Sequence, residues 1–92
     1  MEITFDPIKN TRNVLERGLS FDEVKHFDFQ TAKFWHDTRH SYPELRLVAL
    51  GYVAKRLHVL VFSETEHGIR VISFRKANPR EGAKHGFTLT KN

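Results

Sequence analysis

Hydrophobic and polar residues alternate with two different periods along this chain. Up to about residue 29 the apolar residues recur every three or four positions, which is the period of a helix with one buried face. From residue 31 onward they alternate with polar residues or form short continuous runs, which is typical of strands. The change of period predicts an α+β fold with a helical N-terminal part and a sheet after it.

Two helices are predicted in the N-terminal part, after a short strand over residues 3–5. The first covers about residues 7–17, with Asp6 as its N-cap and a proline at its first position, and Gly18 ends it. The second covers about residues 20–28 and begins with a capping box. Each helix carries an apolar stripe, so both are expected to pack on the sheet.

The remainder of the chain predicts four main strands, over residues 31–37, 45–53, 57–62 and 69–75. Short connections join them, and because a parallel pair needs a crossover of about a dozen residues, neighbouring strands are expected to be antiparallel. Asn78 and Glu81 form a second capping signature, which predicts a short C-terminal helix. The predicted fold is α+β, with two N-terminal helices packed on a four- to five-stranded antiparallel sheet, in a single domain over residues 1–92.

Composition narrows the class of protein. The chain has no cysteine, which excludes disulfides and thiolate chemistry. Its first residues are charged and strand-like, so a secretory signal is not expected. No apolar run approaches the ~20 residues that a membrane-spanning helix needs. We therefore expect a soluble, cytoplasmic protein with no membrane partner.

The charges are distributed unevenly. Residues 1–44 carry six Lys and Arg against eight Asp and Glu, whereas residues 45–92 carry nine against three. A basic half of this kind favours a polyanionic partner, either a nucleic acid or an acidic protein surface. A solvated basic face without a partner explains the same charges equally well.

The most cationic stretch is IRVISFRKANPRE, residues 69–81. Its Arg70 and Arg75, together with Arg46 at the start of an earlier strand, are candidates to bind a phosphate, because a planar guanidinium matches phosphate oxygens. Arg70 and Arg75 are five positions apart, so regular alternation puts them on opposite faces unless the strand bulges. The alternative is that the arginines are structural and pair with nearby carboxylates, for which the candidates are Asp37, Glu44 and Glu81.

Other side chains offer proton transfer and stacking. His36 and His58 are candidate general acids or bases, because an imidazole titrates near neutral pH. Trp35 is the aromatic side chain that we expect to stack on a nucleobase. His36 and His40 have the spacing of metal ligands on a helix, but they flank a strand end and a turn, and only Asp37 offers a third ligand. No metal or other cofactor is therefore expected.

Three parts of the chain together resemble the BrnT family, the toxin components of bacterial type II toxin–antitoxin pairs. They are the run FDPIKNTRNVLERGLSF over residues 5–21, the spacing of Asp37, Glu44, Arg46 and Gly51, and the block over residues 69–81. The last block is the most specific of the three. The resemblance extends from Phe5 to about Glu81, in unchanged order.

The resemblance implies a ribonuclease of RelE-like fold, with helices packed on an antiparallel sheet, that stops translation by cutting RNA. It implies neutralisation by a BrnA antitoxin with a ribbon-helix-helix DNA-binding part. Two copies of each chain would form a complex that represses its own operon. Family members often continue past Glu81 as a longer helix with a tyrosine. Here Gly82 and Gly86 interrupt that pattern, so the helix and its contacts are expected to differ.

The resulting hypothesis is a metal-independent endoribonuclease in which the RNA supplies its own nucleophile, the 2′-hydroxyl. Phosphate binding and stabilisation of the transition-state charge are assigned to Arg46, Arg70 and Arg75. His36 or Glu44 is the candidate base, and Lys76 or His58 the candidate acid. The residues expected to contact RNA further are Trp35, His58 and Arg80.

The rival hypothesis is a non-catalytic binding module whose basic half docks an acidic partner, or binds RNA without cutting it. Such a binder needs cations and aromatic residues but no proton-transfer group near the phosphate. A third possibility is a toxin fold that has lost activity and retains only antitoxin binding. Incubation with RNA in excess EDTA distinguishes a metal-independent ribonuclease from a pure binder.

Overall fold

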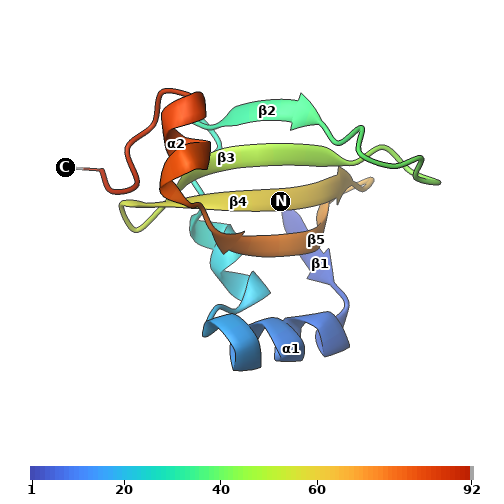
Figure 1. The fold of residues 1–92 in the computed structure, drawn as a ribbon. Coiled ribbons are helices and arrows are strands. Elements are labelled where there is room, and N and C mark those ends of the chain that lie inside the picture. The colour runs from blue at the N-terminus through green and yellow to red at the C-terminus, as the bar shows by residue number, and fades with distance from the viewer. Residues whose placement is uncertain (92) are drawn as a thin grey trace.

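A five-stranded sheet forms the centre of the structure, a computed structural model that describes residues 1–91 (Figure 1). The strands lie in the order β1-β5-β4-β3-β2. Their bounds are Glu2–Phe5 for β1, Lys33–His36 for β2, Leu47–Val53 for β3, Arg56–Glu64 for β4 and Gly68–Lys76 for β5. Two α-helices, α1 (Pro7–Arg17) and α2 (Pro79–Lys84), and one 3₁₀-helix, η1 (Phe21–His26), complete the described elements.

The sheet is mixed, so the prediction of an antiparallel sheet is wrong. Strands β2 to β5 pair antiparallel with their neighbours, as their short connections require. Strand β1 instead pairs parallel with β5, with Ile3 opposite Ile69. The chain between β1 and β5 contains most of the protein, far more than the dozen or so residues that a parallel crossover needs. No short connection joins β1 to β5, so this pair was free to be parallel.

The prediction of two N-terminal helices packed on the sheet is also wrong. The second helical segment is the 3₁₀-helix η1, whose buried Phe21 and Val24, with Phe27 just after it, are spaced by three. A 3₁₀-helix has about three residues per turn, so this spacing aligns all three side chains on the sheet. The expected capping box does not form, because the Ser20 side chain accepts from the Asp22 N–H. Helix α1 buries no residue at all.

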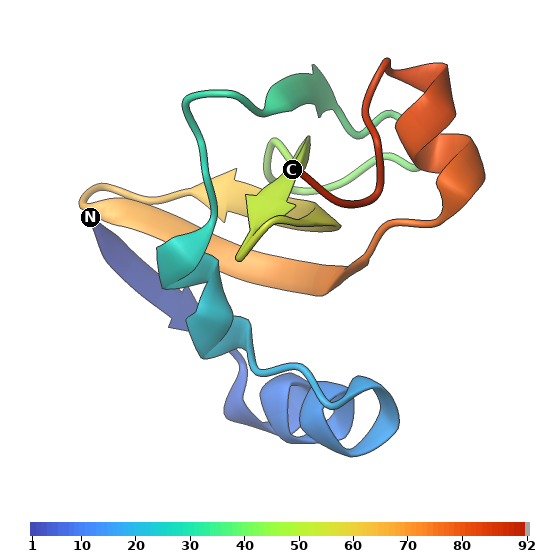
Figure 2. The ribbon, with the colours of Figure 1, turned by 90° about the vertical axis from the view of Figure 1, so that its left-hand side faces the viewer.

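The two faces of the sheet differ in what covers them (Figure 2). The η1 face packs against the 3₁₀-helix and carries Ala49, Leu60, Phe62, Val71 and Phe74. Gly51 also lies on this face, where an added Cβ would lie 2.7 Å from a ring atom of Phe27. The α2 face carries Val48, Leu50, Leu57, Val59 and Val61 and is covered by Phe87 and Leu89 of the C-terminal segment.

A bulge in β5 places its two arginines, Arg70 and Arg75, on the same face of the sheet. Val61 pairs with Ser73 whereas Phe62 pairs with Val71, so Ile72 is an extra residue in β5. Arg70 lies opposite Ser63 and Arg75 lies opposite Val59. Because Ser63 and Val59 are four positions apart on a regularly alternating strand, both arginines lie on the α2 face.

The short C-terminal helix is confirmed. The Asn78 side chain accepts from the Glu81 N–H, and the Glu81 carboxylate accepts from the Asn78 N–H, which is the predicted capping box. In the described part of the chain, no helix has both the length and the apolar character needed to cross a membrane.

Candidate functional site

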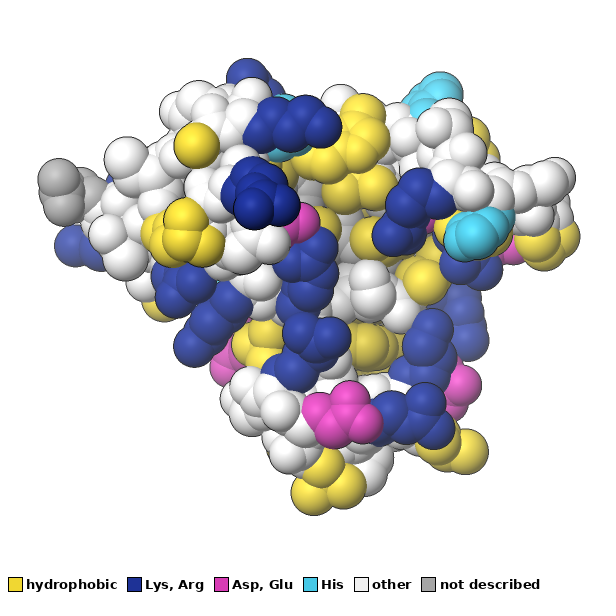
Figure 3. Space-filling view, in the orientation of Figure 1, with side chains coloured by type: hydrophobic (Ala, Val, Ile, Leu, Met, Phe, Trp, Pro, Cys, Tyr) yellow, Lys and Arg dark blue, Asp and Glu magenta, His cyan; other side chains and the backbone are white. Residues whose placement is uncertain are grey.

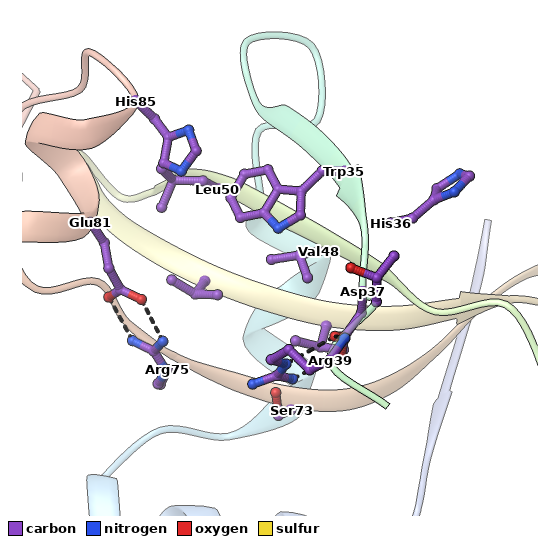
Figure 4. A pocket seen from close by; sticks show the side chains of 13 residues that line it. Trp35, His36, Asp37, Arg39, Val48, Leu50, Ser73, Arg75, Glu81 and His85 are labelled. Atoms are coloured by element: carbon purple, nitrogen blue, oxygen red, sulfur yellow. Dashed lines mark hydrogen bonds and ion pairs between the residues drawn. The ribbon is translucent and has the colours of Figure 1, made fainter. Parts of the chain in front are cut away.

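A pocket of about 280 Å³ opens on the α2 face, between β2, α2 and the loop that follows β2 (Figure 4). Its floor consists of aliphatic side chains from the two central strands, namely Val48, Leu50, Val59 and Val61. These side chains are largely buried although they line the pocket, so the floor is an apolar surface. Polar and aromatic side chains form the walls.

Arg75 and Glu81 form one wall. Arg75 Nη1 and Nη2 donate to the two carboxylate oxygens of Glu81 at 2.8 and 2.6 Å. These bonds, together with the N–H of Asn78, lower the pKa of Glu81 to about 2. The same pair raises the pKa of Arg75 above its usual value. The capping box of α2 therefore also fixes the carboxylate that orients Arg75.

Arg39 and Asp37 form the opposite wall. The Asp37 side chain is 1% exposed and accepts from Arg39 Nε at 2.9 Å and from Nη2 at 2.8 Å. The Tyr42 hydroxyl donates a further bond to Asp37 at 3.2 Å. These bonds hold the pKa of Asp37 well below its usual range. Because 70% of the Arg39 side chain is exposed, its charge remains available at the mouth of the pocket.

Arg39 and Arg75 are close enough to influence one another. The hydrogen bonds that Arg75 donates to Glu81 are the main cause of the raised pKa of Arg75, and the charge of Arg39 opposes that rise. In Figure 4 the Arg39 guanidinium lies over Ser73, on the side of the pocket that faces Arg75. Two guanidinium groups that repel one another across a small hollow favour an anion between them.

Trp35 and His85 form the upper wall. Their rings are stacked, with centroids 4.6 Å apart and an interplanar angle of 12°. Trp35 comes from edge strand β2, where it pairs with Val48, and His85 follows α2. Lys33 Nζ donates to the His85 carbonyl at 2.8 Å, which joins β2 to the end of α2. An aromatic surface beside an apolar floor is suited to stacking on a nucleobase.

Of the residues proposed from sequence, Arg75, Trp35 and His36 line the pocket. The His36 ring is turned away from Arg75 in Figure 4, so it lies at the rim. Arg46 and Glu44 lie outside the lining and pair with one another, Arg46 Nε donating to Glu44 Oε1 at 3.0 Å.

The remaining proposed residues do not line the pocket. Arg70, Lys76 and Arg80 are exposed and lie outside the lining. Arg70 is on the α2 face, whereas Lys76 pairs with His58 and is on the η1 face. His58 is buried on the η1 face, where it stacks on Phe74 with ring centroids 5.1 Å apart. Burial lowers the pKa of His58, and its Nδ1 lies 2.7 Å from the Arg56 carbonyl oxygen. The structure therefore does not bring His58 to the pocket.

Sequence reasoning did not single out Arg39, Ser73 or His85. Arg39 falls in a polar turn without periodicity, and the only signal was its position two residues after Asp37, which suits a local ion pair. Ser73 is inside a strand pattern, and its exposure on the α2 face depends on the bulge. Within residues 1–91, no cluster of three or more His, Asp or Glu side chains forms a candidate metal site.

Comparison with known proteins adds one finding. Residues 5–81 match the model of a family described as the ribonuclease toxin, BrnT, of type II toxin–antitoxin systems. A search of curated proteins found no match. The matched segment contains every residue of the pocket except His85.

Proposed function

Because this chain belongs to the BrnT family of type II toxin–antitoxin ribonucleases, we propose that its pocket on the α2 face cleaves RNA without a metal, by attack of the RNA 2′-hydroxyl. The observation that carries the proposal is the convergence of Arg39 and Arg75 on one apolar-floored pocket beside Trp35. The two cations match a phosphate, and the indole matches a nucleobase.

In the proposed reaction, the scissile phosphate binds between Arg39 and Arg75. Arg39 donates two hydrogen bonds to Asp37, and Arg75 donates two to Glu81. Each guanidinium has five N–H groups, so the others can donate to phosphate oxygens. The carboxylates orient the cations before the substrate arrives, so little reorganisation accompanies the build-up of charge on the phosphorane. We propose that the hydroxyl of Ser73, which lines the pocket on the same strand as Arg75, donates a further hydrogen bond to the phosphate.

Proton transfer completes the chemistry. A base removes the 2′-hydroxyl proton, the 2′-oxygen bonds to phosphorus, and the bond from phosphorus to the 5′-oxygen breaks as an acid protonates that oxygen. The products are a 2′,3′-cyclic phosphate and a 5′-hydroxyl. We propose His85, whose ring stacks on Trp35 in the pocket, as the acid. We propose His36 as the base, and because its ring points away from Arg75, it must turn toward the bound phosphate to act. Glu81, with a pKa of about 2, is too weak a base for this role near neutral pH.

The exposed cations outside the pocket extend the proposed RNA site. Arg70 lies on the same sheet face as Arg75, and Arg80 belongs to α2, whereas Lys76 pairs with His58 and so lies on the η1 face. We propose that Arg46, Arg70 and Arg80 contact phosphates on either side of the cleaved one. Such contacts add affinity that is independent of sequence and falls with salt.

The test is incubation of the purified protein with single-stranded RNA in excess EDTA, followed by analysis of the product ends. We expect cleavage that leaves a 2′,3′-cyclic phosphate. We expect no cleavage where the nucleotide on the 5′ side of the scissile phosphate carries a 2′-deoxyribose, because that nucleotide supplies the attacking hydroxyl. Binding without cleavage would instead favour the non-catalytic module, and cleavage that requires a divalent metal would contradict the mechanism.

The family also implies a cognate antitoxin as a partner. We propose that this partner is of the BrnA type, that two toxins and two antitoxins form the complex, and that the ribbon-helix-helix part of the antitoxin binds operator DNA. The site of action would be the cytoplasm, where the RNA substrate occurs. Co-expression with the neighbouring reading frame, with light scattering on the purified complex, tests both partner and stoichiometry.

A further inference from the structure

Helix α1 is attached to the rest of the protein by its polar face. Asn10 Oδ1 accepts from the Phe21 N–H at 2.7 Å. Asn13 Nδ2 donates to the Leu19 carbonyl at 2.9 Å and to the Phe74 carbonyl at 3.0 Å. Side-chain amides, rather than aliphatic packing, therefore fix the helix to η1 and β5.

The apolar stripe of α1 points the other way. Ile8 is 71% exposed and Leu15 is 81% exposed, and their spacing of seven residues places them about two turns apart on one side of the helix. Thr11 lies between them, and its hydroxyl donates to the Pro7 carbonyl at 3.0 Å, so the stripe holds no unsatisfied hydroxyl. A shallow groove follows the stripe.

This orientation is the reverse of what a surface helix of a monomeric domain shows. Such a helix turns its apolar stripe to the core and its polar face to water. Single exposed aliphatic residues are common, but an aligned pair on a helix whose inward contacts are polar is typical of an interaction surface. The stripe is not needed to hold α1, since the two asparagines already do so.

The charge of the helix indicates what covers the stripe. Lys9, Arg12 and Arg17 give α1 three cations against the single carboxylate of Glu16, and of these four side chains Arg12 and Glu16 line the groove. Figure 3 shows hydrophobic and charged side chains side by side at the lower end of the molecule, where α1 lies in Figure 1. A second copy of this chain, with its net charge of +4, would bring like charges together. An acidic partner is therefore favoured.

We propose that the stripe formed by Ile8, Thr11 and Leu15 docks the cognate antitoxin, through an amphipathic helix of the antitoxin with apolar residues on one side and acidic residues at its margins. An apolar pair two turns apart matches the residues that one face of a helix presents. The proposal rests on the proposed function only in taking the partner to be the antitoxin that the family implies.

The docking stripe and the pocket belong to different parts of the molecule. The groove is lined by α1 alone, whereas the pocket is lined by β2 to β5, α2 and the loop after β2. Helix α1 projects from the η1 face, on the opposite side of the sheet from α2 (Figures 1 and 2). Substitutions in the stripe should therefore weaken antitoxin binding and leave RNA cleavage by the free toxin unchanged.

The test is the double variant Ile8→Asp/Leu15→Asp in the full chain, titrated calorimetrically with purified antitoxin from the neighbouring reading frame. We expect Kd to rise by about a hundredfold or more, because two aliphatic side chains would no longer be buried at the interface. Leu45→Asp, at another exposed leucine, is the matched control and should leave Kd unchanged. The reversal Arg12→Glu should weaken binding more at low salt than at high salt.

Several outcomes would overturn the proposal. One is an unchanged Kd for the double variant. Another is a wild-type toxin that dimerises alone in light scattering while the double variant is monomeric, which would make a second copy the occupant. Leu15→Ala, which adds no charge, provides the measurement if the double variant fails to fold. Because calorimetry needs no cleavage, failure of this proposal and failure of the ribonuclease proposal give different results.

Discussion

Glu81 holds Arg75 with two parallel hydrogen bonds, and the same carboxylate closes the capping box of α2. One side chain thus links the start of a helix to the cation of the proposed active site. Arg39 enters the pocket from the other side with its own carboxylate, Asp37. Both arginines are therefore held in place by carboxylates of the protein itself.

Replacing Arg75 with alanine should lower kcat/KM for RNA cleavage by about 10²–10³, the loss expected when one preorganised donor to a developing charge is removed. Arg75→Lys should recover only part of that loss, since an ammonium lacks the planar fork. Cleavage of a defined single-stranded RNA measures both variants. Arg17→Ala, at an exposed arginine of α1, is the control, and full activity of a folded Arg75→Ala variant would contradict the proposed role.

Arg39→Ala should reduce cleavage as strongly as Arg75→Ala, although nothing in the sequence periodicity marks Arg39. The double variant should lose much less than the product of the two single losses, because both arginines bind one phosphate. A double-mutant cycle on kcat/KM measures this coupling. Additive losses would show that the two cations act on different phosphates.

RNA binding should change the fluorescence of Trp35, which is the single tryptophan of the chain and is 37% exposed at the pocket. Titration with a 2′-deoxy-substituted RNA separates binding from cleavage. Trp35→Phe should bind this RNA more tightly than Trp35→Ala does, since stacking on an aromatic face contributes about 1–3 kcal/mol per base. An unchanged emission at saturating RNA would place the binding site elsewhere.

Stability should fall as acid protonates Glu81. Its pKa is about 2 in the folded protein against an ordinary value of 4.5, so the folded state binds this proton less readily than the unfolded chain. The resulting stabilisation is complete above about pH 4.5 and is lost as pH falls towards 2. Melting temperatures between pH 2 and 7 should show a shallower acid slope for Glu81→Gln. Asp37, whose pKa is also depressed, maintains the remaining slope. Identical slopes for variant and wild type would contradict the assignment.

Gly51→Ala should destabilise the fold by about 1–3 kcal/mol, the range for overpacking a filled core. The added Cβ would lie 2.7 Å from the Phe27 ring and 2.9 Å from the Cβ of Ala32. Urea unfolding measures the change in the free energy of unfolding. Gly86→Ala is not a suitable control, because Gly86 has a positive φ of 77° and an alanine there would be strained. Ala83→Gly, on exposed helix α2, provides a comparison without overpacking. Unchanged stability of Gly51→Ala would contradict the prediction and would show that Phe27 can move to make room for the added Cβ.

Local sequence signals predicted the local structure well. Asp6, Gly18 and the Asn78–Glu81 box mark helix ends through bonds to neighbouring residues, and the structure confirms each of them. The type of η1 was missed because a spacing of three suits an α-helix and a 3₁₀-helix alike. The direction of β1 was missed because its partner strand is more than 60 residues away, and no local pattern records that pairing.

The site was predicted in part for the same reason. Arg75 and Trp35 belong to strands whose position follows from the pattern, and both line the pocket. Arg39 and His85 belong to irregular segments that tertiary contacts fold back over the sheet, Asp37 holding one and Lys33 the other. His58 has the right chemistry, but it lies on the opposite face of the sheet. Which face a residue occupies depends on register, and a histidine is tolerated on either.

The extra residue in β5 fixes how much this strand can change in length. Deleting Ile72 would restore regular alternation and leave Ile69, Val71 and Phe74 on the η1 face, because Val71 and Ser73 would then be neighbours like their partners Phe62 and Val61. Deleting Val71 or Phe74 instead would remove a side chain from the hydrophobic core. The strand should therefore tolerate loss of Ile72 better than loss of either neighbour, and the connection between β4 and β5 should accept insertions.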